Sequence, residues 1–302
     1  MTTGYLHPQY AASLGEVGVP YELARCGGWI LRRPIPNVPY HDGMGCYPLF
    51  ACQQWSQLHP DVEDLKHDLV SLSLVTDPFG GYDMRYLRES FDVLLPFKEH
   101  LVVDLDRTID TFVSSHHRRY ARKASREVYV ERCHDPVQFI GEWTALYAAL
   151  IRKHRIRGTA AFSRQSLATQ LHVPGTVMFR AVHKGATVAM TLWYVQGKVG
   201  YYHLGASSDA GYDVHASFAL FWRSIENFAA TKLRWLNLGS GAGLTNDSRD
   251  GLVRFKRGWS TDTRTAYFCG RIFDQRKYAE AVRKNHGSRA NYFPAYRSGE
   301  FG

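Results

Sequence analysis

Hydrophobic and polar positions are most regularly spaced between residues 199 and 259, where they predict a strand, a helix and a second strand. Residues 199–205 are apolar or aromatic and end at a polar turn, 206–213, which is typical of a strand. From about His215 to Thr231, apolar residues recur at helical spacing and predict one apolar helix face. The run 233–238 has the pattern of the second strand. This order predicts two parallel strands joined by a right-handed crossover.

Polar and glycine-rich segments follow both predicted strands. They are the turn 206–213, the glycine loop 239–243 and the run DGLVRFKRGW at 250–259. Because ligands of open α/β sheets bind at the carboxyl ends of parallel strands, we expect these segments to form one site. The glycine loop lacks the G-x-G-x-x-G spacing and is followed by a polar loop at 245–250 instead of a helix, which excludes a dinucleotide site.

The remaining chain carries shorter patterns of the same kinds. Predicted strands are 28–33, 70–75, 100–105, 127–132, 177–182, 187–195 and 265–271, with 46–53 a further candidate, and 40–45 is predicted to be a loop. Predicted helices are 61–69, 84–91, one starting at Asp135, 163–171 and 274–285. We expect Thr111, Ser114 or Ser115 to cap a further helix, and Asp213 to cap the helix after the polar turn.

The composition is that of a globular protein. Of the 302 residues, 45% are apolar and 22% charged, which excludes a disordered chain. No apolar run approaches the roughly 20 residues of a membrane span, and the first 19 residues lack a signal pattern, so we expect a cytoplasmic location. The five cysteines have no paired spacing, which argues against a disulfide framework and a zinc site.

The net charge of +9 predicts a polyanionic partner such as tRNA, a nucleotide-linked precursor or the phosphates of coenzyme A. The densest basic run lies at 114–126, and its basic residues have no acidic neighbours to offset them. The alternative interpretation is a solvated helix face. The predicted polyanion-binding residues are Arg118, Arg119, Arg122 and Lys123.

Three segments of the 199–259 stretch resemble the second domain of the Fem-type aminoacyl/acyl transferases. They are the tyrosine-rich strand before the helix, the run WLNLG at 235–239, and DGLVRFKRGW at 250–259. The resemblance implies an α/β (α+β) tandem GNAT-like fold with mixed sheets flanked by helices. It implies a shortened GNAT-like half at 1–107 and a C-terminal GNAT-like domain at 108–302.

The resemblance also implies roles for particular residues. Acyl transfer to an amine builds negative charge on a carbonyl oxygen, and in the resembling family the lysine at Lys256 stabilises that charge; the alternative is a surface lysine at the start of a basic helix. The aromatic residue before it, Phe255, helps to position the acceptor. Asp77 corresponds to a carboxylate near the nucleophilic amine; the alternative is an aspartate that starts a turn. No metal or redox cofactor is implied.

Further residues are predicted to line the substrate site. Tyr201 and Tyr202 lie on the strand whose tyrosines line the family's substrate channel, and alternation puts Tyr201 and His203 on one face of it. His203 has two interpretations, an acid/base group or a hydrogen-bonded core histidine. Asp209 in the polar turn and Arg254 beside the Phe-Lys pair complete the set.

The predicted reaction is transfer of an amino acid from aminoacyl-tRNA to an amine of a small peptide or precursor. The glycine-rich turn that binds acyl-CoA in GNAT enzymes is poor here, since residues 206–213 contain only Gly211, and this favours the tRNA donor. Acyl-CoA-dependent N-acyl transfer and a catalytically silent polyanion-binding protein remain the alternatives.

Overall fold

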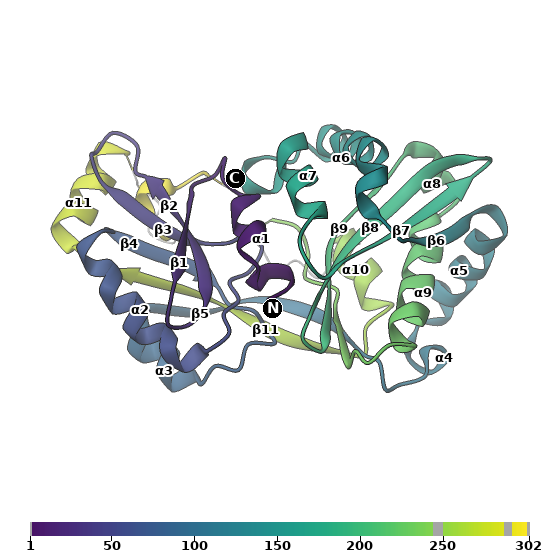
Figure 1. Ribbon diagram of the computed structural model, residues 1–302, viewed down its shortest axis with the longest axis horizontal. Coiled ribbons are helices and arrows are strands. Elements are labelled where there is room, and N and C mark those ends of the chain that lie inside the picture. The colour runs from purple at the N-terminus through teal and green to yellow at the C-terminus, as the bar shows by residue number, and fades with distance from the viewer. Residues whose placement is uncertain (1, 244–249, 287–291, 301–302) are drawn as a thin grey trace. The chain divides into compact units, whose positions relative to one another are not determined.

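The computed structural model describes residues 2–243, 250–286 and 292–300, and these form two compact units (Figure 1). The signature unit comprises Met1–Gly4, Glu99–Arg157 and Ala161–Arg264 and contains the run 250–259. The companion unit comprises Tyr5–Lys98, Gly158–Ala160 and Thr265–Gly302. Both units are discontinuous in sequence. The division into halves at residues 107 and 108 stays a prediction about the two repeats of the fold.

The signature unit is built on a mixed sheet. Its strands are β6 (Tyr129–Cys133), β7 (Thr176–His183), β8 (Ala186–Gln196), β9 (Val199–Ser207), β10 (Trp235–Asn237) and, from Glu99 onward, β5 (Val93–Asp104). Strands β6 to β9 form an antiparallel meander, whereas β10 pairs in parallel with β9 and antiparallel to β5. The predicted crossover is confirmed, because α9 (Ala216–Ala229) joins the two parallel strands.

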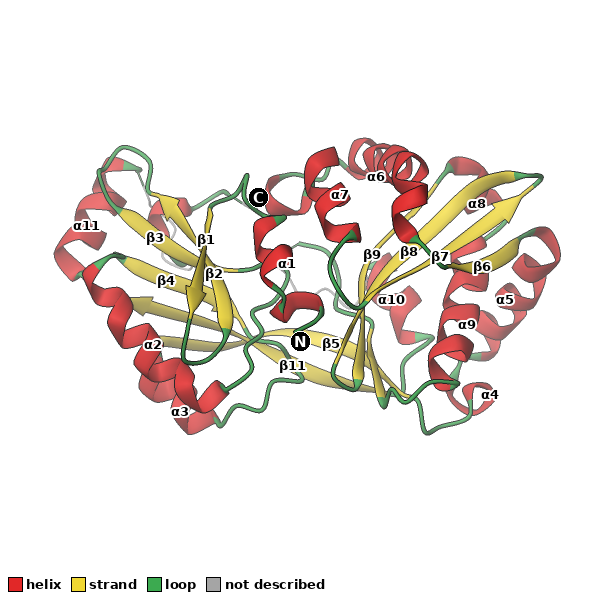
Figure 2. Ribbon diagram, viewed as in Figure 1, coloured by secondary structure: helices red, strands yellow, loops and turns green. Residues whose placement is uncertain are grey.

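Helices cover both faces of this sheet (Figure 2). On one face lie α6 (Ile140–His154) and α7 (Arg164–Leu171), and on the other lie α9 and α5 (Ser115–Glu127). The short helices are α4 (Ile109–Phe112), α8 (Asp209–Asp213) and α10 (Gly251–Arg257). The confirmed fold class is therefore α/β, with a mixed sheet flanked by helices.

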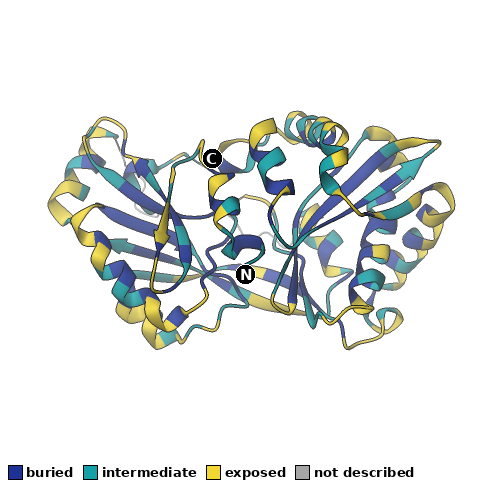
Figure 3. Ribbon diagram, viewed as in Figure 1, coloured by how far each residue is buried: buried dark blue, intermediate teal, exposed yellow. Residues whose placement is uncertain are grey.

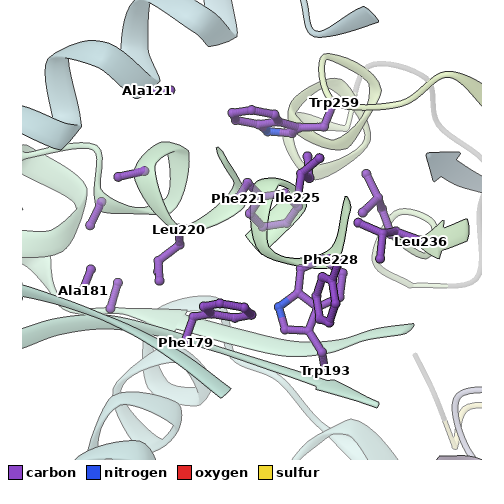
Figure 4. Close-up of a cluster of buried hydrophobic side chains, with 14 of the residues drawn as sticks. Ala121, Phe179, Ala181, Trp193, Leu220, Phe221, Ile225, Phe228, Leu236 and Trp259 are labelled. Carbon is purple, nitrogen blue, oxygen red and sulfur yellow. The ribbon is translucent and has the colours of Figure 1, made fainter. Parts of the chain in front are cut away.

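The core of the signature unit lies between α9 and the strands. Phe179 and Trp193 of the strands pack against Phe221 and Phe228 of α9, and Trp259 packs on the far side of Phe221 (Figure 4). Figure 3 shows the strands mainly buried and the outer helix faces exposed. Since burying one such aromatic side chain stabilises the fold by about 1.5–3 kcal/mol, this cluster fixes how α9 lies against the sheet.

The companion unit repeats the same strand order. Its strands are β1 (Val19–Leu23), β2 (Gly28–Pro34), β3 (His41–Gly45), β4 (Ser71–Val75) and, from Thr265, β11 (Asp262–Ile272). An antiparallel meander, β1 to β3, leads to a parallel pair, β3 and β4, and β4 pairs antiparallel with β11. The order meander, parallel pair and antiparallel strand thus occurs in both units, as a tandem fold requires.

Helices and two hydrophobic clusters complete the companion unit. Its helices are α1 (Pro8–Ala12), α2 (Leu58–Asp64), α3 (Met84–Ser90) and α11 (Gln275–Lys284). One cluster includes residues of α2, α3 and β4, and the other joins α11 to Ile35, Val70 and Tyr296. Among the described residues, 3-10 helices are formed by Gly4–Leu6, Trp55–Gln57, Leu65–His67, Pro136–Phe139, Gly158–Ala160 and Ala295–Arg297.

Three local predictions are wrong. Residues 41–45 form strand β3 instead of a loop, because Gly43 and Gly45 serve close packing: a Cβ would lie 2.9 Å from Leu72 Cδ1 at Gly43 and 2.7 Å from Leu74 Cβ at Gly45. Residues 46–53 form no strand.

The third wrong prediction concerns Asp213, which ends α8 instead of capping α9. The residue that caps α9 is His215, and its side chain makes no capping hydrogen bond.

Across the described part of the chain, none of the helices is both long and apolar enough to cross a membrane.

Candidate active site

The parallel strands β9 and β10 are paired over three positions only. Their register runs from Val199↔Trp235 to Tyr201↔Asn237, where β10 ends, while β9 continues to Ser207. A register shift between β8 and β9 falls at His203, the residue of β9 between the pairs Leu192↔Leu204 and Trp193↔Tyr202. The carboxyl ends of the two parallel strands therefore form a fork, as the sequence predicts for a ligand site.

Lys256 of α10 reaches the loop that follows β10. Its Nζ donates a hydrogen bond to the carbonyl oxygen of Ser240 at 2.7 Å, and its side chain is only 5% exposed. Gly239 adopts φ +72°, and a Cβ there would lie 3.3 Å from Nζ. The glycine loop thus provides both the turn and the room for a buried ammonium group.

The short helix α10 is held in place at its start by Asp250. The Asp250 carboxylate accepts hydrogen bonds from the amides of Leu252 and Val253 at 2.6 and 3.4 Å. An aspartate at this position caps the helix and favours its N-terminal dipole. The predicted polar loop before it, residues 245–249, lies outside the described residues.

The ammonium group of Lys256 lies next to an aromatic ring of β9. The ring centre of Tyr202 lies 5.4 Å from Lys256 Nζ, within the range of a cation–π interaction. That ring also packs against Trp193 and Phe221, and burial raises the pKa of Tyr202. Phe255 packs against Phe221 with ring centres 4.9 Å apart. The predicted residues Tyr202, Phe255 and Lys256 are thus close together.

The loop after β10 is also fixed by Asn237, which the sequence did not single out. Its Oδ1 accepts from the amide of Gly239 at 2.8 Å and lies 3.0 Å from Nδ1 of His100 on β5. Because an amide oxygen only accepts, the imidazole carries its proton on Nδ1 in this contact. Both side chains are buried, so they hold the loop that presents the Ser240 carbonyl to Lys256.

His203 and Tyr201 lie on the other face of β9. His203 Nε2 is 3.2 Å from Oε1 of Gln170 on α7, and its ring stacks on Tyr194 at 4.7 Å. Burial lowers the pKa of His203 to about 3, so the imidazole is neutral at physiological pH. Tyr201 is buried as well. The predicted alternation is correct, and it separates these two side chains from the face that carries Tyr202.

Asp209 and Arg254 occupy exposed positions. Asp209 begins α8 and pairs with Lys153 at 2.8 Å, and this contact lowers the pKa of the aspartate. Arg254 lies on α10 two residues before Lys256, with its side chain exposed. The structure does not bring either side chain into the cluster around Lys256.

Asp77 belongs to the companion unit. It is buried directly after β4, and its Oδ1 accepts from the amide of Phe79 at 2.9 Å. This contact is the turn geometry of the alternative interpretation. Burial raises the pKa of Tyr5, and the Asp77 carboxylate raises it further.

The basic run forms α5, capped by Ser114, as predicted. The side chains of Arg119, Arg122 and Lys123 are exposed, whereas Arg118 is half-buried and its Nη1 donates to the carbonyls of Asp110 and Val113 at 2.8 and 2.6 Å. Three of the four predicted residues are therefore available to a polyanion, and Arg118 has a structural contact in addition.

His117, on the buried side of α5, was not predicted as a site residue. Its Nε2 lies 2.8 Å from the carbonyl oxygen of Phe255, and burial lowers its pKa. The signal that could have found it is Gly258 in the run 250–259, because a Cβ at Gly258 would lie 2.1 Å from the His117 ring.

No group of three His, Cys, Asp or Glu side chains among the described residues has the arrangement of a metal site. All five cysteines are buried and unpaired with one another by disulfides.

This mixed sheet, with a lysine at the fork of its parallel strands, is an acyltransferase fold of the GNAT class. A family model described as acetyltransferase (GNAT) domain matches residues 104–257, which is just over half of the chain. The chain belongs to this family. No curated protein sequence matches it.

Solved structures show the same fold over nearly the whole chain. FemX superposes with a TM-score of 0.65 at 13% identity, covering 90% of this chain and 92% of FemX. The C-terminal domain of a protein assigned as lysylphosphatidylglycerol synthetase from Agrobacterium fabrum gives 0.64 at 14%, covering 91% and 90%. L-PGS from Bacillus licheniformis gives 0.57 at 16%, covering 93% and 97%. The predicted Fem-type, tandem GNAT fold is confirmed.

Proposed function

We propose that this protein is an aminoacyltransferase that forms an amide bond. It transfers an amino acid from aminoacyl-tRNA to an amine of a small peptide or biosynthetic precursor. One observation carries the proposal: the buried ammonium group of Lys256 lies at the fork of β9 and β10, with its Nζ 2.7 Å from the Ser240 carbonyl.

The reaction needs a fixed positive charge at the carbonyl being attacked. The acceptor nitrogen forms a bond to the ester carbonyl carbon, and a negative charge develops on the carbonyl oxygen. When that intermediate collapses, the bond to the ribose oxygen breaks, and the ribose oxygen takes up a proton as the amine gives one up. An ammonium group held at the oxygen lowers the barrier, typically by about 3–4 kcal/mol for one such donor.

The other predicted residues have supporting roles in this proposal. Tyr202 provides an aromatic ring beside the Lys256 ammonium group, which suits the side chain of an aminoacyl group. Phe255, whose ring packs against Phe221, remains the predicted positioning residue for the acceptor. Asp77 remains a candidate for accepting the amine proton. Tyr201, His203, Asp209 and Arg254 remain predicted substrate contacts, although none of them is in the cluster around Lys256.

The turn between β9 and α9 favours tRNA over acyl-CoA as the donor. A phosphate-binding turn offers free amide N–H groups to the ligand. Here the amides of Gly211, Tyr212 and Val214 donate within the turn, to Ser208 Oγ, Ser208 O and Ala210 O. The exposed Arg119, Arg122 and Lys123 of α5 offer positive charge for an extended polyanion instead.

The names of the similar structures also support aminoacyl transfer. A lysylphosphatidylglycerol synthetase is named for joining a lysyl group to an acceptor, and its C-terminal domain has this fold. Acyl-CoA-dependent N-acyl transfer is the second candidate, because the matching family model is described as an acetyltransferase. A reaction that uses charged tRNA takes place in the cytoplasm, which is part of this proposal.

The test compares donors directly. Purified protein is incubated with aminoacyl-tRNA carrying labelled amino acids, or with acyl-CoA, and a panel of small peptides and amines. We expect amine-dependent release of the amino acid from tRNA and its recovery as an amide. If the protein transferred an acyl group from acyl-CoA and nothing from aminoacyl-tRNA, the donor would be acyl-CoA and the tRNA proposal would be wrong. Retained tRNA binding with no transfer from either donor would make the protein a silent polyanion-binding protein.

A further inference from the structure

The imidazole of His117 connects the start of the basic helix α5 to the end of α10. Its Nε2 lies 2.8 Å from the carbonyl oxygen of Phe255, and its Nδ1 lies 2.8 Å from Ser114 Oγ. A carbonyl oxygen only accepts, so Nε2 carries the proton and Nδ1 accepts from the Ser114 hydroxyl. Both ring nitrogens are therefore used, and the ring is 7% exposed.

The carbonyl of Phe255 needs this donor. In a regular helix it would accept from the amide four residues later, at Trp259. That amide donates instead to the Lys256 carbonyl at 3.0 Å, as the helix tightens at its last turn. His117 thus supplies the hydrogen bond that α10 lacks next to its lysine.

Gly258 makes room for the imidazole. A Cβ at this position would lie 2.1, 2.3 and 2.4 Å from Cε1, Nδ1 and Nε2 of His117. The backbone at Gly258 has φ −67° and ψ −12°, which any residue adopts, so the glycine is required for space alone. The Gly258 carbonyl also accepts from the Ser114 amide at 3.0 Å, which ties the same two helix ends a second time.

These contacts decide where Lys256 points. Lys256 is the next residue after Phe255, and α10 is only two turns long, so a rotation of its last turn would move the ammonium group away from the Ser240 carbonyl. The rings of Phe255, Phe218 and Trp259 lie 5.7, 5.1 and 5.0 Å from the His117 ring and hold the imidazole from the other sides.

We propose that His117 is a positioning residue for Lys256, acting through its hydrogen bond to the Phe255 carbonyl and the space left by Gly258. The proposal deepens the proposed function and rests on it in so far as Lys256 is the catalytic group. In this proposal α5 has two functions: its exposed basic side chains attract a polyanion, and its buried His117 holds α10 in the orientation that acyl transfer requires.

The test uses four variants. His117→Leu removes both hydrogen bonds, and Gly258→Ala fills the space of the ring. His117→Gln keeps an N–H donor at about the reach of Nε2. His116→Gln changes the neighbouring exposed histidine on the same helix and is the matched control.

We expect the single-turnover rate at saturating donor to fall about 10- to 100-fold in His117→Leu and Gly258→Ala, because small displacements of catalytic groups are costly. Donor affinity should stay unchanged, and His117→Gln and His116→Gln should keep the wild-type rate. A merely structural histidine would lower the unfolding temperature in His117→Leu and leave the rate of the folded fraction normal, and that result would overturn the proposal. So would equal losses of rate in His117→Gln and His117→Leu.

A second measurement needs no substrate. The rate at which acetic anhydride modifies Lys256, followed by mass spectrometry, reports how well α10 shields its side chain. We expect faster modification in His117→Leu and Gly258→Ala and the wild-type rate in His117→Gln. If the wild-type protein transfers nothing from any donor, the proposed function fails, whereas the modification rates still decide on His117. Identical modification in all variants would overturn the positioning role.

Discussion

Tyr202 and Lys256 form a cation–π pair at the fork of β9 and β10, with the ammonium nitrogen 5.4 Å from the ring centre. The hydroxyl of Tyr202 lies over Gly205, where a Cβ would be 2.1 Å from the oxygen. The missing side chain of Gly205 therefore lets the Tyr202 ring lie along its own strand. This arrangement presents the ring to Lys256.

Lys256→Met should mainly slow the chemical step. If its ammonium stabilises the developing oxyanion, the single-turnover rate at saturating donor should fall about 100- to 1000-fold with donor and acceptor binding largely intact. Lys256→Arg should rescue poorly, since a planar fork does not replace a compact ammonium at one oxygen. Lys198→Met, at an exposed lysine of the same unit, is the control. A wild-type single-turnover rate in Lys256→Met would show that Lys256 does not stabilise the developing oxyanion.

Gly205→Ala should disturb the Tyr202 ring and slow the reaction. Loss of the cation–π contact is worth about 0.5–2 kcal/mol, or about 2- to 30-fold in rate. Because the closest clash is with the hydroxyl, while the ring carbon Cζ would lie 3.0 Å from the new Cβ, Tyr202→Phe should restore part of the activity in the Gly205→Ala background while changing little by itself. Single-turnover rates of the two single variants and the double variant test this, and a double variant as slow as Gly205→Ala would contradict it.

The exposed basic residues of α5 should make donor binding depend on salt. Replacing Arg119, Arg122 and Lys123 together with glutamine should reduce the slope of log affinity against log salt by about 2–3, if each neutralises one phosphate. Arg118→Gln should instead lower the unfolding temperature, because its guanidinium bonds the Asp110 and Val113 carbonyls. Affinities of tRNA measured over a salt series decide this. An unchanged slope would show that these residues bind no phosphate and that α5 presents only a solvated helix face.

His203 should make the protein less stable in mild acid. An unperturbed histidine has a pKa of about 6.5, whereas burial lowers the pKa of His203 to about 3. The unfolded chain therefore takes up the proton first, and stability present above pH 6.5 is lost as the pH falls toward 3. Each pH unit lowers the free energy of unfolding by about 1.4 kcal/mol, so the protein should lose about 2 kcal/mol of stability between pH 6.5 and pH 5.

Urea unfolding of wild type and His203→Gln at the two pH values measures this difference. The glutamine variant should lose less stability on acidification, whatever its stability at neutral pH. The exposed His134→Gln is the control and should keep the wild-type dependence. Parallel losses in wild type and His203→Gln would show that another group titrates.

Asp42 should be important for the stability of the companion unit. The carboxylate is fully buried and is held by Arg33 Nε at 3.2 Å, Arg297 Nε at 2.5 Å and the Tyr296 hydroxyl at 3.1 Å. Asp42→Asn removes the buried charge that Arg33 and Arg297 share and leaves them only the partly exposed Glu300 carboxylate, so it should destabilise by about 3 kcal/mol. Asp64→Asn breaks an exposed pair with Arg25 and should change the stability much less, because water screens the pair. Equal costs in denaturant unfolding would contradict this.

Much of the fold could be predicted from local patterns. The spacing of apolar residues gave the crossover from β9 through α9 to β10, and alternation put Tyr202 and His203 on opposite faces. Strand β3 was missed because Gly43 and Gly45 look like loop residues until their close contacts with the neighbouring strand are known. Helix α8 was missed because it is a single short segment started by Ser208, whose Oγ accepts from the Gly211 amide.

The site was predictable in part for a similar reason. Lys256 and Phe255 lie in a run with a recognisable pattern, and Tyr202 lies in a strand that alternation orients. The partner of Phe255, His117, is 138 residues away, and no periodicity connects the two. Its neighbours in sequence are basic, so the charge of the run gave no sign that this histidine faces inward. Gly258 is a glycine because the His117 ring lies against it, but a glycine in a sequence does not show which residue it contacts.

The pairing of β4 with β11 has a consequence for the order in which the protein is made. Residues 71–75 leave the ribosome about 200 residues before their partners at 268–272. At about 5–20 residues per second, β4 waits roughly 10–40 seconds for that neighbour. Residues 99–264, which make up nearly all of the signature unit, are synthesised within that interval. The edge of β4 that pairs with β11 therefore stays unpaired throughout this interval, and an unpaired strand edge is a site at which another chain can pair.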